Sequence, residues 1–222
     1  MRVGRIVDLS HRVDENTQIF PGDPEPSSEP AVTIEDYGMN VLSLHLGSHS
    51  GTHVDAPYHF VGDGKRIDDM DPKLFVGPAM LMDVRGKEPR GRITVEDLQP
   101  YETLLCREVI AVMWTGWDEH YGTPRYYDHP FLDHRAAQLL LDSGVKTIAI
   151  DALSVDETVL EGPHPEGYPA HKLLCGAGCV IAENLTGLGD LDFPNPVLSL
   201  LPVKLGDADG APVRAVAMEV LG

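Results

Sequence analysis

The segment from His49 to Val61, HSGTHVDAPYHFV, limits the possible folds more than any other part of the chain. The spacing of its first two histidines, His49 and His53, would place both side chains on one face of a helix. Gly51 lies between them and Pro57 follows, and glycine and proline are the two poorest helix formers. We therefore predict that a strand leads into a turn here, and that Gly51 bends the chain.

The strand that leads into this turn is expected over residues 41–46. Its side chains alternate between two sets, Val41, Ser43 and His45 on one side and Leu42, Leu44 and Leu46 on the other, which predicts a half-buried strand. Four fully extended residues would hold His49 and His53 about 13 Å apart. The bend at Gly51 is therefore needed before both can reach one ion, whereas His53 and Asp55 already share one side of an extended chain.

His49, His53 and Asp55 together offer two imidazoles and a carboxylate, a ligand set suited to zinc or manganese. A single histidine is more often a surface residue or a hydrogen-bonded core residue than a metal ligand. Four candidate ligands between His49 and His59, with glycine and proline shaping the backbone, instead favour a metal-dependent active site. Because His59 lies between two aromatic residues, simple packing of its ring is the alternative interpretation.

This segment resembles the His-x-Gly-Thr-His-x-Asp-x-Pro-x-His signature of the metal-dependent cyclase-like hydrolases, the family of bacterial kynurenine formamidase and isatin hydrolase. The similarity continues along most of the chain, in Val7–Ser10, Phe20–Asp23, Trp114–Trp117, Ile150–Ser154 and His171–Glu183. The resemblance implies an α/β fold of the swivelling β/β/α type, with a mixed sheet and a single domain spanning residues 1–222. It also implies assembly as a homodimer or homotetramer.

His171 and Glu183 have the twelve-residue spacing that completes a two-metal site in the formamidase branch of this family. The resemblance thus assigns five residues to the metal centre: His49, His53, Asp55, His171 and Glu183. In this arrangement Asp55 and Glu183 bridge two ions, the second of which His171 holds, and His59 transfers protons. Zinc is expected ahead of manganese, with one or two ions per chain. Independently of the resemblance, two carboxylates in a dry pocket would repel each other without cations.

A competing metal site would use Cys175 and Cys179, which lie four residues apart between His171 and Glu183. All four side chains would align on a helix. Two glycines between the cysteines oppose that helix. We predict a helical turn that ends near Cys175, a glycine-rich connection and a strand from Cys179, with both cysteines as small buried side chains.

The rest of the chain predicts alternating helices and strands, the pattern of a mixed α/β protein. The expected helices are Thr94–Asp97, which has a capping pattern, and Pro130–Ser143, capped by Asp133; the expected strands are Val109–Trp114, Lys146–Asp151 and Val213–Val220. The proline-rich segment Phe20–Pro30 is expected to be an ordered loop or an arm that covers a neighbour.

The acidic balance of the chain, 35 Asp and Glu against 17 Lys and Arg, argues against binding to nucleic acid or to anionic membranes. No apolar run approaches the roughly 18 residues of a membrane span. The N-terminal residues lack the apolar region of a signal peptide and there are only three cysteines, so we expect a cytoplasmic protein. We interpret the acidic residues as a well-solvated surface, with adaptation to high salt as the alternative.

The ligand set predicts amide hydrolysis, because a metal with an open position activates water and polarises a carbonyl oxygen. Imidazole in general titrates near neutral pH, so a histidine such as His59 is suited to move the proton. The resemblance makes the substrate a small aryl amide, with N-formylkynurenine of tryptophan catabolism as the leading candidate. The alternatives are an isatin hydrolase-like cyclic amidase and a non-catalytic metal-binding homologue.

Phe20 is the predicted substrate-binding residue. It stands where the formamidase branch has a tryptophan, so an aromatic contact is kept without the indole N–H donor. Other aromatic residues that could line the pocket are Trp114, Trp117, Tyr126 and Tyr127. For these four, a place in the hydrophobic core is the favoured interpretation.

Overall fold

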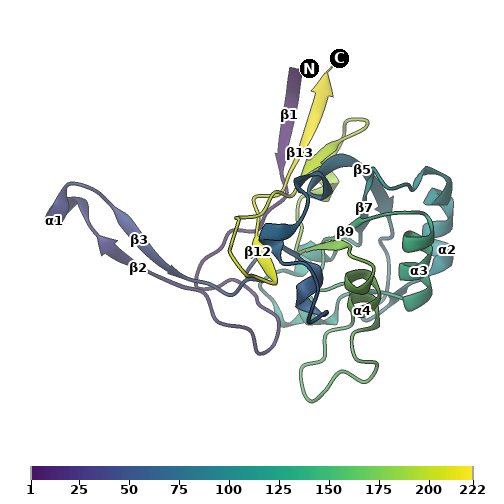
Figure 1. Ribbon diagram of the computed structural model, residues 1–222, viewed down its shortest axis with the longest axis horizontal. Coiled ribbons are helices and arrows are strands. Elements are labelled where there is room, and N and C mark those ends of the chain that lie inside the picture. The colour runs from purple at the N-terminus through teal and green to yellow at the C-terminus, as the bar shows by residue number, and fades with distance from the viewer. Residues whose placement is uncertain (1, 222) are drawn as a thin grey trace.

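The computed structural model describes residues 2–221, and a nine-stranded mixed sheet runs through it (Figure 1). In spatial order its strands are β1 (Arg2–Asp8), β13 (Val216–Leu221), β11 (Val197–Ser199), β5 (Val76–Asp83), β7 (Ile110–Trp114), β9 (Thr147–Ile150), β10 (Val180–Glu183), β4 (His53–Asp55) and β12 (Gly210–Pro212). Strands β5, β7, β9 and β10 are parallel, and the strands on either side of this block pair antiparallel. The expected α/β architecture with a mixed sheet is confirmed.

Three α-helices cover one face of the parallel strands: α2 (Val95–Leu98), α3 (His134–Asp142) and α4 (Pro169–Gly176). Successive residues of β7 divide between two cores, since Ala111 and Met113 pack with the helices whereas Ile110 and Val112 pack on the opposite face. Strands β7, β9 and β10 are therefore buried on both faces, which explains their continuous apolar runs. Within residues 2–221, no helix is both long and apolar enough to span a bilayer.

Helix α3 begins later than the helix expected over Pro130–Ser143. Phe131 and Leu132 form the short strand β8 (Phe131–Leu132), which pairs parallel with β6 (Arg92–Ile93), so the helix begins only at His134. The expected cap is confirmed, because the Asp133 side chain accepts from the backbone N–H of Arg135. Short 3-10 helices complete the fold at Pro57–His59, Ile67–Asp69, Pro72–Leu74, Gln99–Leu104, Trp117–His120, Pro124–Asp128 and Leu188–Asp190.

The capping box predicted for Thr94 and Asp97 is present at the start of α2. Strands β7 and β9 lie within the ranges predicted for them. In contrast, β13 begins at Val216 rather than at Val213. The backbone N–H of Val213 donates to the carbonyl of Thr52, 3.0 Å away, and this bond takes the residue out of the register of β13.

The two neighbouring cysteines lie in the core rather than in a metal site. Helix α4 ends at Gly176 and β10 starts at Val180, which confirms the predicted helical turn, glycine-rich connection and strand. Cys175 and Cys179 are buried free thiols that pack beneath the helices. Burial raises the pKa of Cys175 to about 12, so this thiol stays protonated and is a poor metal ligand.

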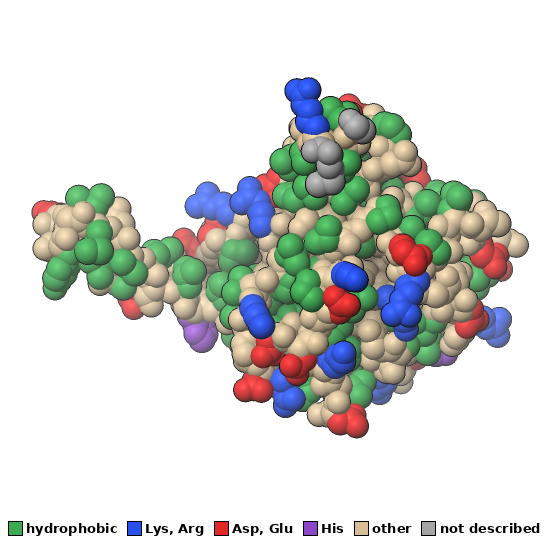
Figure 2. Space-filling view, turned by 45° about the horizontal axis from the view of Figure 1, so that its top comes forward, with side chains coloured by type: hydrophobic (Ala, Val, Ile, Leu, Met, Phe, Trp, Pro, Cys, Tyr) green, Lys and Arg blue, Asp and Glu red, His purple; other side chains and the backbone are tan. Residues whose placement is uncertain are grey.

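An arm that contains residues 41–46 projects from the body (Figure 1). The half-buried strand expected for these residues is therefore wrong in its burial. The arm consists of β2 (Ser27–Val32), α1 (Ile34–Tyr37) and β3 (Val41–His45), and its two strands pair with each other. Strand β3 exists as predicted, but every residue in it is exposed, because neither face of the hairpin packs on the body. Phe20–Pro30 is a loop only in its first part, since β2 begins at residue 27. Figure 2 shows apolar side chains gathered at the tip of the arm.

The packing of α3 can be tested with a matched pair of substitutions. Leu140 is fully buried between this helix and the sheet, whereas Gln138 is exposed. We expect Leu140→Ala to lower the free energy of unfolding by about 2–5 kcal/mol, because it removes buried methyl groups and leaves a cavity. Gln138→Ala should change it by less than about 0.5 kcal/mol. Urea denaturation measures both, and equal effects of the two substitutions would contradict the packing.

Candidate metal centre

Strands β4 and β10 place an imidazole and two carboxylates side by side. The strands are antiparallel, with His53 opposite Glu183 and Asp55 opposite Ile181. Because alternate residues of a strand point the same way, His53 and Asp55 share one side, as predicted. All three ionisable side chains are buried, with exposed fractions of 5% or less. Each can place one ligand atom within 4.8 Å of the others, a compact His-Asp-Glu cluster.

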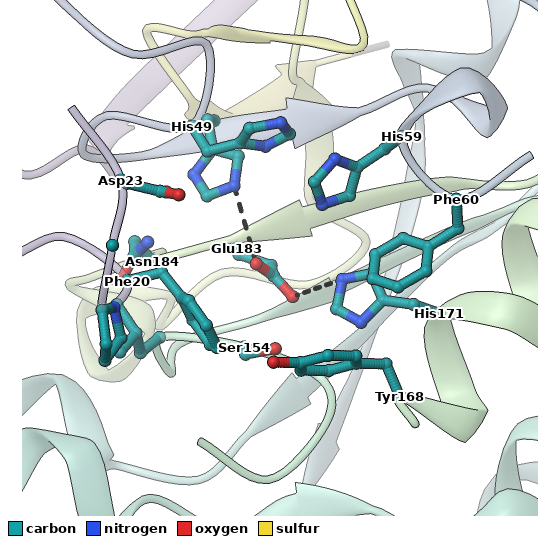
Figure 3. A pocket seen from close by; sticks show the side chains of 14 residues that line it. Phe20, Asp23, His49, His59, Phe60, Ser154, Tyr168, His171, Glu183 and Asn184 are labelled. Carbon is teal, nitrogen blue, oxygen red and sulfur yellow. Dashed lines mark ion pairs between the residues drawn. The ribbon is translucent and has the colours of Figure 1, made fainter. Parts of the chain in front are cut away.

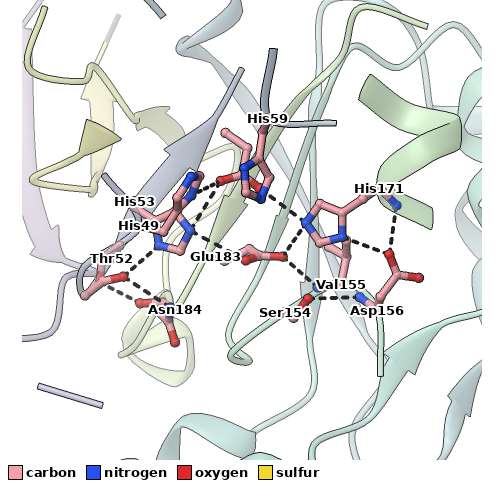
Figure 4. A network of polar contacts seen from close by, with 12 residues as sticks. His49, Thr52, His53, His59, Ser154, Val155, Asp156, His171, Glu183 and Asn184 are labelled. Atoms are coloured by element: carbon pink, nitrogen blue, oxygen red, sulfur yellow. Dashed lines mark hydrogen bonds and ion pairs between the residues drawn. The ribbon is translucent and has the colours of Figure 1, made fainter. Parts of the chain in front are cut away.

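Two further histidines reach this cluster from other segments (Figure 4). His49 lies in the turn before β4, where Gly51 has a φ of +67° and bends the chain as predicted. Nδ1 of His49 lies 2.8 Å from Oδ1 of Asp55. His171 lies in the first turns of α4, and its Nε2 is 3.4 Å from Oδ2 of Asp55. The structure therefore brings together all five residues that the sequence assigned to the metal centre.

Both carboxylates span the space between His53 and His171. Oδ1 of Asp55 lies 3.3 Å from Nε2 of His53, and the two oxygens of Glu183 lie 3.5 Å and 3.4 Å from His53 and His171. Within residues 2–221, the buried Oδ2 of Asp55 has no hydrogen-bond partner. Leaving a buried carboxylate oxygen without a donor is costly, so this donor set fits a divalent cation that the carboxylates would share.

The histidine nitrogens that face away from the carboxylate pair also have acceptors. The three pairs are His53 Nδ1 with the Gly51 carbonyl at 2.8 Å, His171 Nδ1 with Asp156 at 2.8 Å, and His49 Nε2 with Asp209 at 3.0 Å. Such hydrogen bonds fix the orientation and the tautomer of metal-binding imidazoles. Each ring thereby presents its other nitrogen to the carboxylate pair.

Asp156 and Asp209 are functional candidates that the sequence did not reveal. Asp156 also accepts from the backbone N–H groups of Ala170 and His171 at the start of α4, both at 2.9 Å. Asp209 comes next to the metal centre only because β12 pairs with β4. Its one local signal is the Asp-Gly pair before a strand, which predicts a turn rather than a site.

Opposite charges within the cluster outweigh the effect of burial on its pKa values. Burial lowers the pKa of an imidazole, but Asp55 and Asp209 raise the pKa of His49 to about 9, and Asp55 and Glu183 raise that of His53 to about 10. Burial raises the pKa of a carboxyl, yet the imidazoles hold the pKa of Asp55 well below its usual range and that of Glu183 at about 2. Without metal, the ionised carboxylates are therefore balanced by protonated imidazoles.

A cavity of about 330 Å³ opens over the cluster (Figure 3). Apart from the cluster itself, its lining consists of Phe20, Pro21, Gly22, Asp23, His59, Phe60, Leu153, Ser154, Tyr168 and Asn184. Three aromatic rings form part of the wall, with the Phe20 and Phe60 ring centroids 6.2 Å and 5.7 Å from that of Tyr168. Among these described lining residues there is no lysine or arginine. The structure thus places Phe20 where it can contact a ligand in the cavity.

The four other aromatic residues considered from the sequence lie outside this cavity. Trp117 and Tyr126 are buried in a separate small cluster, against which Tyr127 packs. Trp114 packs partly buried against the core on the face of the sheet away from the helices. The favoured interpretation, a place in the hydrophobic core, is confirmed for Trp117 and Tyr126, whereas Trp114 and Tyr127 pack against the core and are only partly buried.

His59 lies beside the cluster and contributes to the same cavity. It follows β4 in the turn Pro57–His59, and its ring centroid is 4.0 Å from that of His49. Its Nδ1 lies 3.2 Å from Oδ2 of Asp209. The ring also meets Phe60 edge-on, with centroids 4.7 Å apart. His59 therefore combines an aromatic contact with a place in the cavity wall beside the cluster.

Known proteins resemble this chain in sequence and in fold. The putative cyclase family matches residues 7–157. The kynurenine formamidase of Bacillus cereus is 34% identical over 97% of this chain and 98% of its own length, and that of Geobacillus thermodenitrificans is 33% identical over 94% and 95%. Isatin hydrolase A from Labrenzia aggregata, bound to benzyl benzoate, has a TM-score of 0.86 at 25% identity, covering 96% of this chain and 93% of that chain. An isatin hydrolase bound to the product analogue thioisatinate has the same fold, with a TM-score of 0.88 at 23% identity over 96% and 92%.

We expect metal binding to release protons. Near neutral pH the metal-free cluster holds protons on His49 and His53, whose pKa values are about 9 and 10, and on His171, whose pKa the carboxylates of Asp156, Asp55 and Glu183 raise well above its usual value. Coordination needs neutral imidazoles, so the apparent affinity for zinc should fall as the pH falls. About two protons should leave per chain when one ion binds to His49 and His53, and about three when a second ion binds to His171. Calorimetric titration with zinc in buffers of different ionisation enthalpy counts them. Binding without proton release would contradict this charge assignment.

Proposed function

This chain belongs to the putative cyclase family, and from that membership we propose that it is a metal-dependent hydrolase that cleaves the C–N bond of a small aryl amide. N-formylkynurenine, an intermediate of tryptophan catabolism, is the leading substrate. The observation that carries the proposal is the cluster of three imidazoles and two buried carboxylates beside a cavity with aromatic walls. The formamidase relatives, which match nearly the whole chain, support the same reaction.

Zinc is the proposed ion ahead of manganese, with one or two ions per chain. His49, His53 and Asp55 would hold the first ion and His171 the second, and the carboxylates of Asp55 and Glu183 would be shared between them. When bound, a divalent ion supplies a Lewis acid that polarises the amide carbonyl and makes water a better nucleophile at neutral pH. Both metals accept a mixed set of imidazole and carboxylate ligands, which is why both are retained.

His59 is the proposed proton carrier. Its Nδ1–H donates to Asp209, so Nε2 is the nitrogen that can exchange a proton in the cavity. There it takes a proton from the attacking water and returns it to the departing nitrogen, since an amine leaves poorly unless it is protonated. The ring lies 4.0 Å from His49 and 5.9 Å from His171, centroid to centroid, and so borders both halves of the metal centre.

The cavity wall indicates how the substrate would be held. Phe20, Phe60 and Tyr168 offer ring faces and edges to an aryl group. Asp23 is the carboxylate on this wall outside the metal cluster, and burial raises its pKa above the usual value. Because no lysine or arginine lines the described cavity, the aryl formamide end should lie inside. The charged amino-acid end of N-formylkynurenine should extend towards solvent.

The same wall favours one alternative substrate. Isatin is an uncharged cyclic amide, and a cavity with aromatic walls and no cation suits it. An isatin hydrolase-like cyclic amidase is therefore the second candidate, and the 25% identical isatin hydrolase A supports it. A non-catalytic metal-binding homologue is the third, but the place of His59 in the cavity argues for turnover.

The first experiment is hydrolysis of N-formylkynurenine by the purified protein, followed by the absorbance of kynurenine. Parallel samples are stripped with a chelator and reloaded with zinc or manganese. We expect metal-dependent turnover with kcat/KM of about 10⁴ M⁻¹s⁻¹ or more. Failure of every metal-loaded sample, together with turnover of isatin, would transfer the assignment to the cyclic amidase.

The roles of two histidines can be separated by substitution. His59→Ala should keep the metal but lower kcat by about 10²–10⁴-fold, because it removes the proton carrier and no proposed ligand. His53→Ala should lose metal as well as turnover, since it deletes a ligand. Metal content by elemental analysis and kcat under saturating zinc distinguish the two cases. Normal turnover in His59→Ala would reject the proton-transfer role.

We also propose that the protein forms a homodimer or homotetramer in the cytoplasm, with the arm docked on a second copy. An isolated two-stranded hairpin is only marginally stable in water. In this hairpin Leu42 and Leu44 are also exposed, with exposed fractions of 55% and 61%. The arm is acidic, with no lysine or arginine between residues 13 and 64. The segment 201–205 on the body offers exposed apolar residues around Lys204, a complementary surface. The three free cysteines within the described chain suit a reducing compartment.

If the arm docks on a second copy, charged substitutions in its strand β3 should change the oligomeric state. Leu42→Glu combined with Leu44→Glu should shift the protein to the monomer, because it places charges in the proposed interface. Leu104→Glu, at a leucine that is 57% exposed on the body, is the matched control and should leave the assembly unchanged. Size-exclusion chromatography with light scattering gives the masses. A wild-type monomer, or an unchanged oligomer in the double variant, would refute docking through the arm.

A further inference from the structure

Asp209 emerges beside the metal centre because of how two strands pair. It comes directly before β12, and the pairing sets Gly210 opposite Asp55 of β4. The carbonyl of Asp209 accepts the backbone N–H of Ala56 at 2.8 Å, which extends this pairing by one residue. The backbone of Asp209 is thus fixed against the segment that joins Asp55 to His59.

The carboxylate of Asp209 contacts two functional histidines with one oxygen. Its Oδ2 lies 3.0 Å from Nε2 of His49 and 3.2 Å from Nδ1 of His59. Its other oxygen, Oδ1, accepts from the hydroxyl of Ser48 at 2.8 Å. The side chain is 35% exposed, so water reaches one side of it, while the two imidazoles occupy the other. A single carboxylate therefore bridges a proposed metal ligand and the proposed proton carrier.

The residue after Asp209 supports the same imidazole from a second side. A Cβ atom at Gly210 would lie 2.7 Å from Cε1 of His49 and 2.7 Å from the carbonyl oxygen of Val54. Such contacts are too short for any side chain, so the His49 ring rests directly on the backbone of β12. Asp209 and Gly210 together fix the plane of the ring and the direction of its Nε2–H bond.

We propose that Asp209 is a positioning residue that aligns His49 and His59 with each other. Through His49 it turns Nδ1 towards Asp55, beside which a metal ion would bind. Through His59 it keeps the proton on Nδ1 and leaves Nε2 free for the reaction, because a carboxylate accepts and cannot donate. The proton carrier and the first metal ligand thereby share one anchor and keep a constant separation. This inference rests on the proposed function.

The neutral analogue separates geometry from charge. Asp209→Asn keeps a carbonyl oxygen that can accept from both imidazoles, and its amide group can donate to Ser48. Asp209→Ala removes every side-chain contact. Asp207→Asn is the matched control, since it removes a charge in the same loop at a side chain that is 95% exposed. Asparagine also tolerates the positive φ of 60° at position 207.

The first measurement needs no turnover. Long-range ¹H–¹⁵N spectra of the ring nitrogens report the tautomer of His59, which is assigned by its loss in His59→Gln. We expect a protonated Nδ1 and an unprotonated Nε2 in the zinc-loaded wild type, in Asp209→Asn and in Asp207→Asn. Asp209→Ala should show a mixture of both tautomers. A wild-type tautomer in Asp209→Ala would overturn the proposal.

The second measurement uses two substrates under saturating zinc. Formanilide needs its leaving nitrogen protonated, whereas 4-nitrophenyl formate releases a stable anion. In Asp209→Ala we expect kcat for formanilide to fall about 10–100-fold with little change in KM, and kcat for the ester to fall less than about tenfold. Asp209→Asn should recover most of the loss. Equal losses on both substrates, or no recovery in Asp209→Asn, would refute positioning.

The two hypotheses fail in different ways. If the wild type hydrolyses neither substrate, the aryl formamidase assignment fails, and the tautomer spectra still test Asp209. If the wild type hydrolyses formanilide while Asp209→Ala matches it in kcat and in tautomer, Asp209 has no positioning role and the proposed function stands. Zinc affinity adds an independent readout, because loss of the anchor on His49 should weaken binding about 10–100-fold.

Discussion

Two carboxylates buried side by side are the constraint on which the rest of this structure depends. Asp55 and Glu183 lie on adjacent strands at exposed fractions of 0% and 5%. Two negative charges buried away from water repel each other strongly. Without neighbouring positive charges, at least one of the two carboxylates would take up a proton. Three imidazoles converge on them and supply either protons or metal coordination. His49 in the turn before β4, His53 in β4 and His171 in α4 therefore balance the buried charges as well as offering ligands.

The topology of the sheet explains why these residues meet. Strands β9 and β10 run parallel, and β10 ends at Glu183, while β4 runs the opposite way and starts at His53. The carboxyl end of one strand and the amino end of its neighbour thus share one edge of the sheet. The loop after β9 adds Ser154 and Asp156 at this edge. In open α/β sheets such an edge is where ligands bind, and here the reversal of strand direction brings ligands from both sides.

Local chemistry made part of this site predictable from sequence. The bend at Gly51, the shared side of His53 and Asp55 and the Asp133 cap each follow from a few neighbouring residues. The pairing of His171 with Glu183 needed a family resemblance, because their spacing alone does not exclude a helix. Asp209 and Tyr168 could not be found in this way, since strand pairing and loop paths over long separations place them. The exposure of β3 was missed for a related reason: alternation predicts a strand, but not whether anything covers it.

The distribution of charge near the cavity determines which ions and products the site favours. Residues 13–64 contain three of the proposed ligands, the arm and Asp23, but no lysine or arginine. At physiological salt, charges act over a screening length of about 8 Å, so these local acids matter more than the net charge of the whole chain. They favour the arrival of divalent cations and disfavour bound anions. Hydrolysis of a neutral amide generates a carboxylate, either formate or the opened ring. The described cavity lining offers that anionic product no lysine or arginine. The electrostatics that suit an uncharged substrate therefore weaken the binding of the product in the cavity.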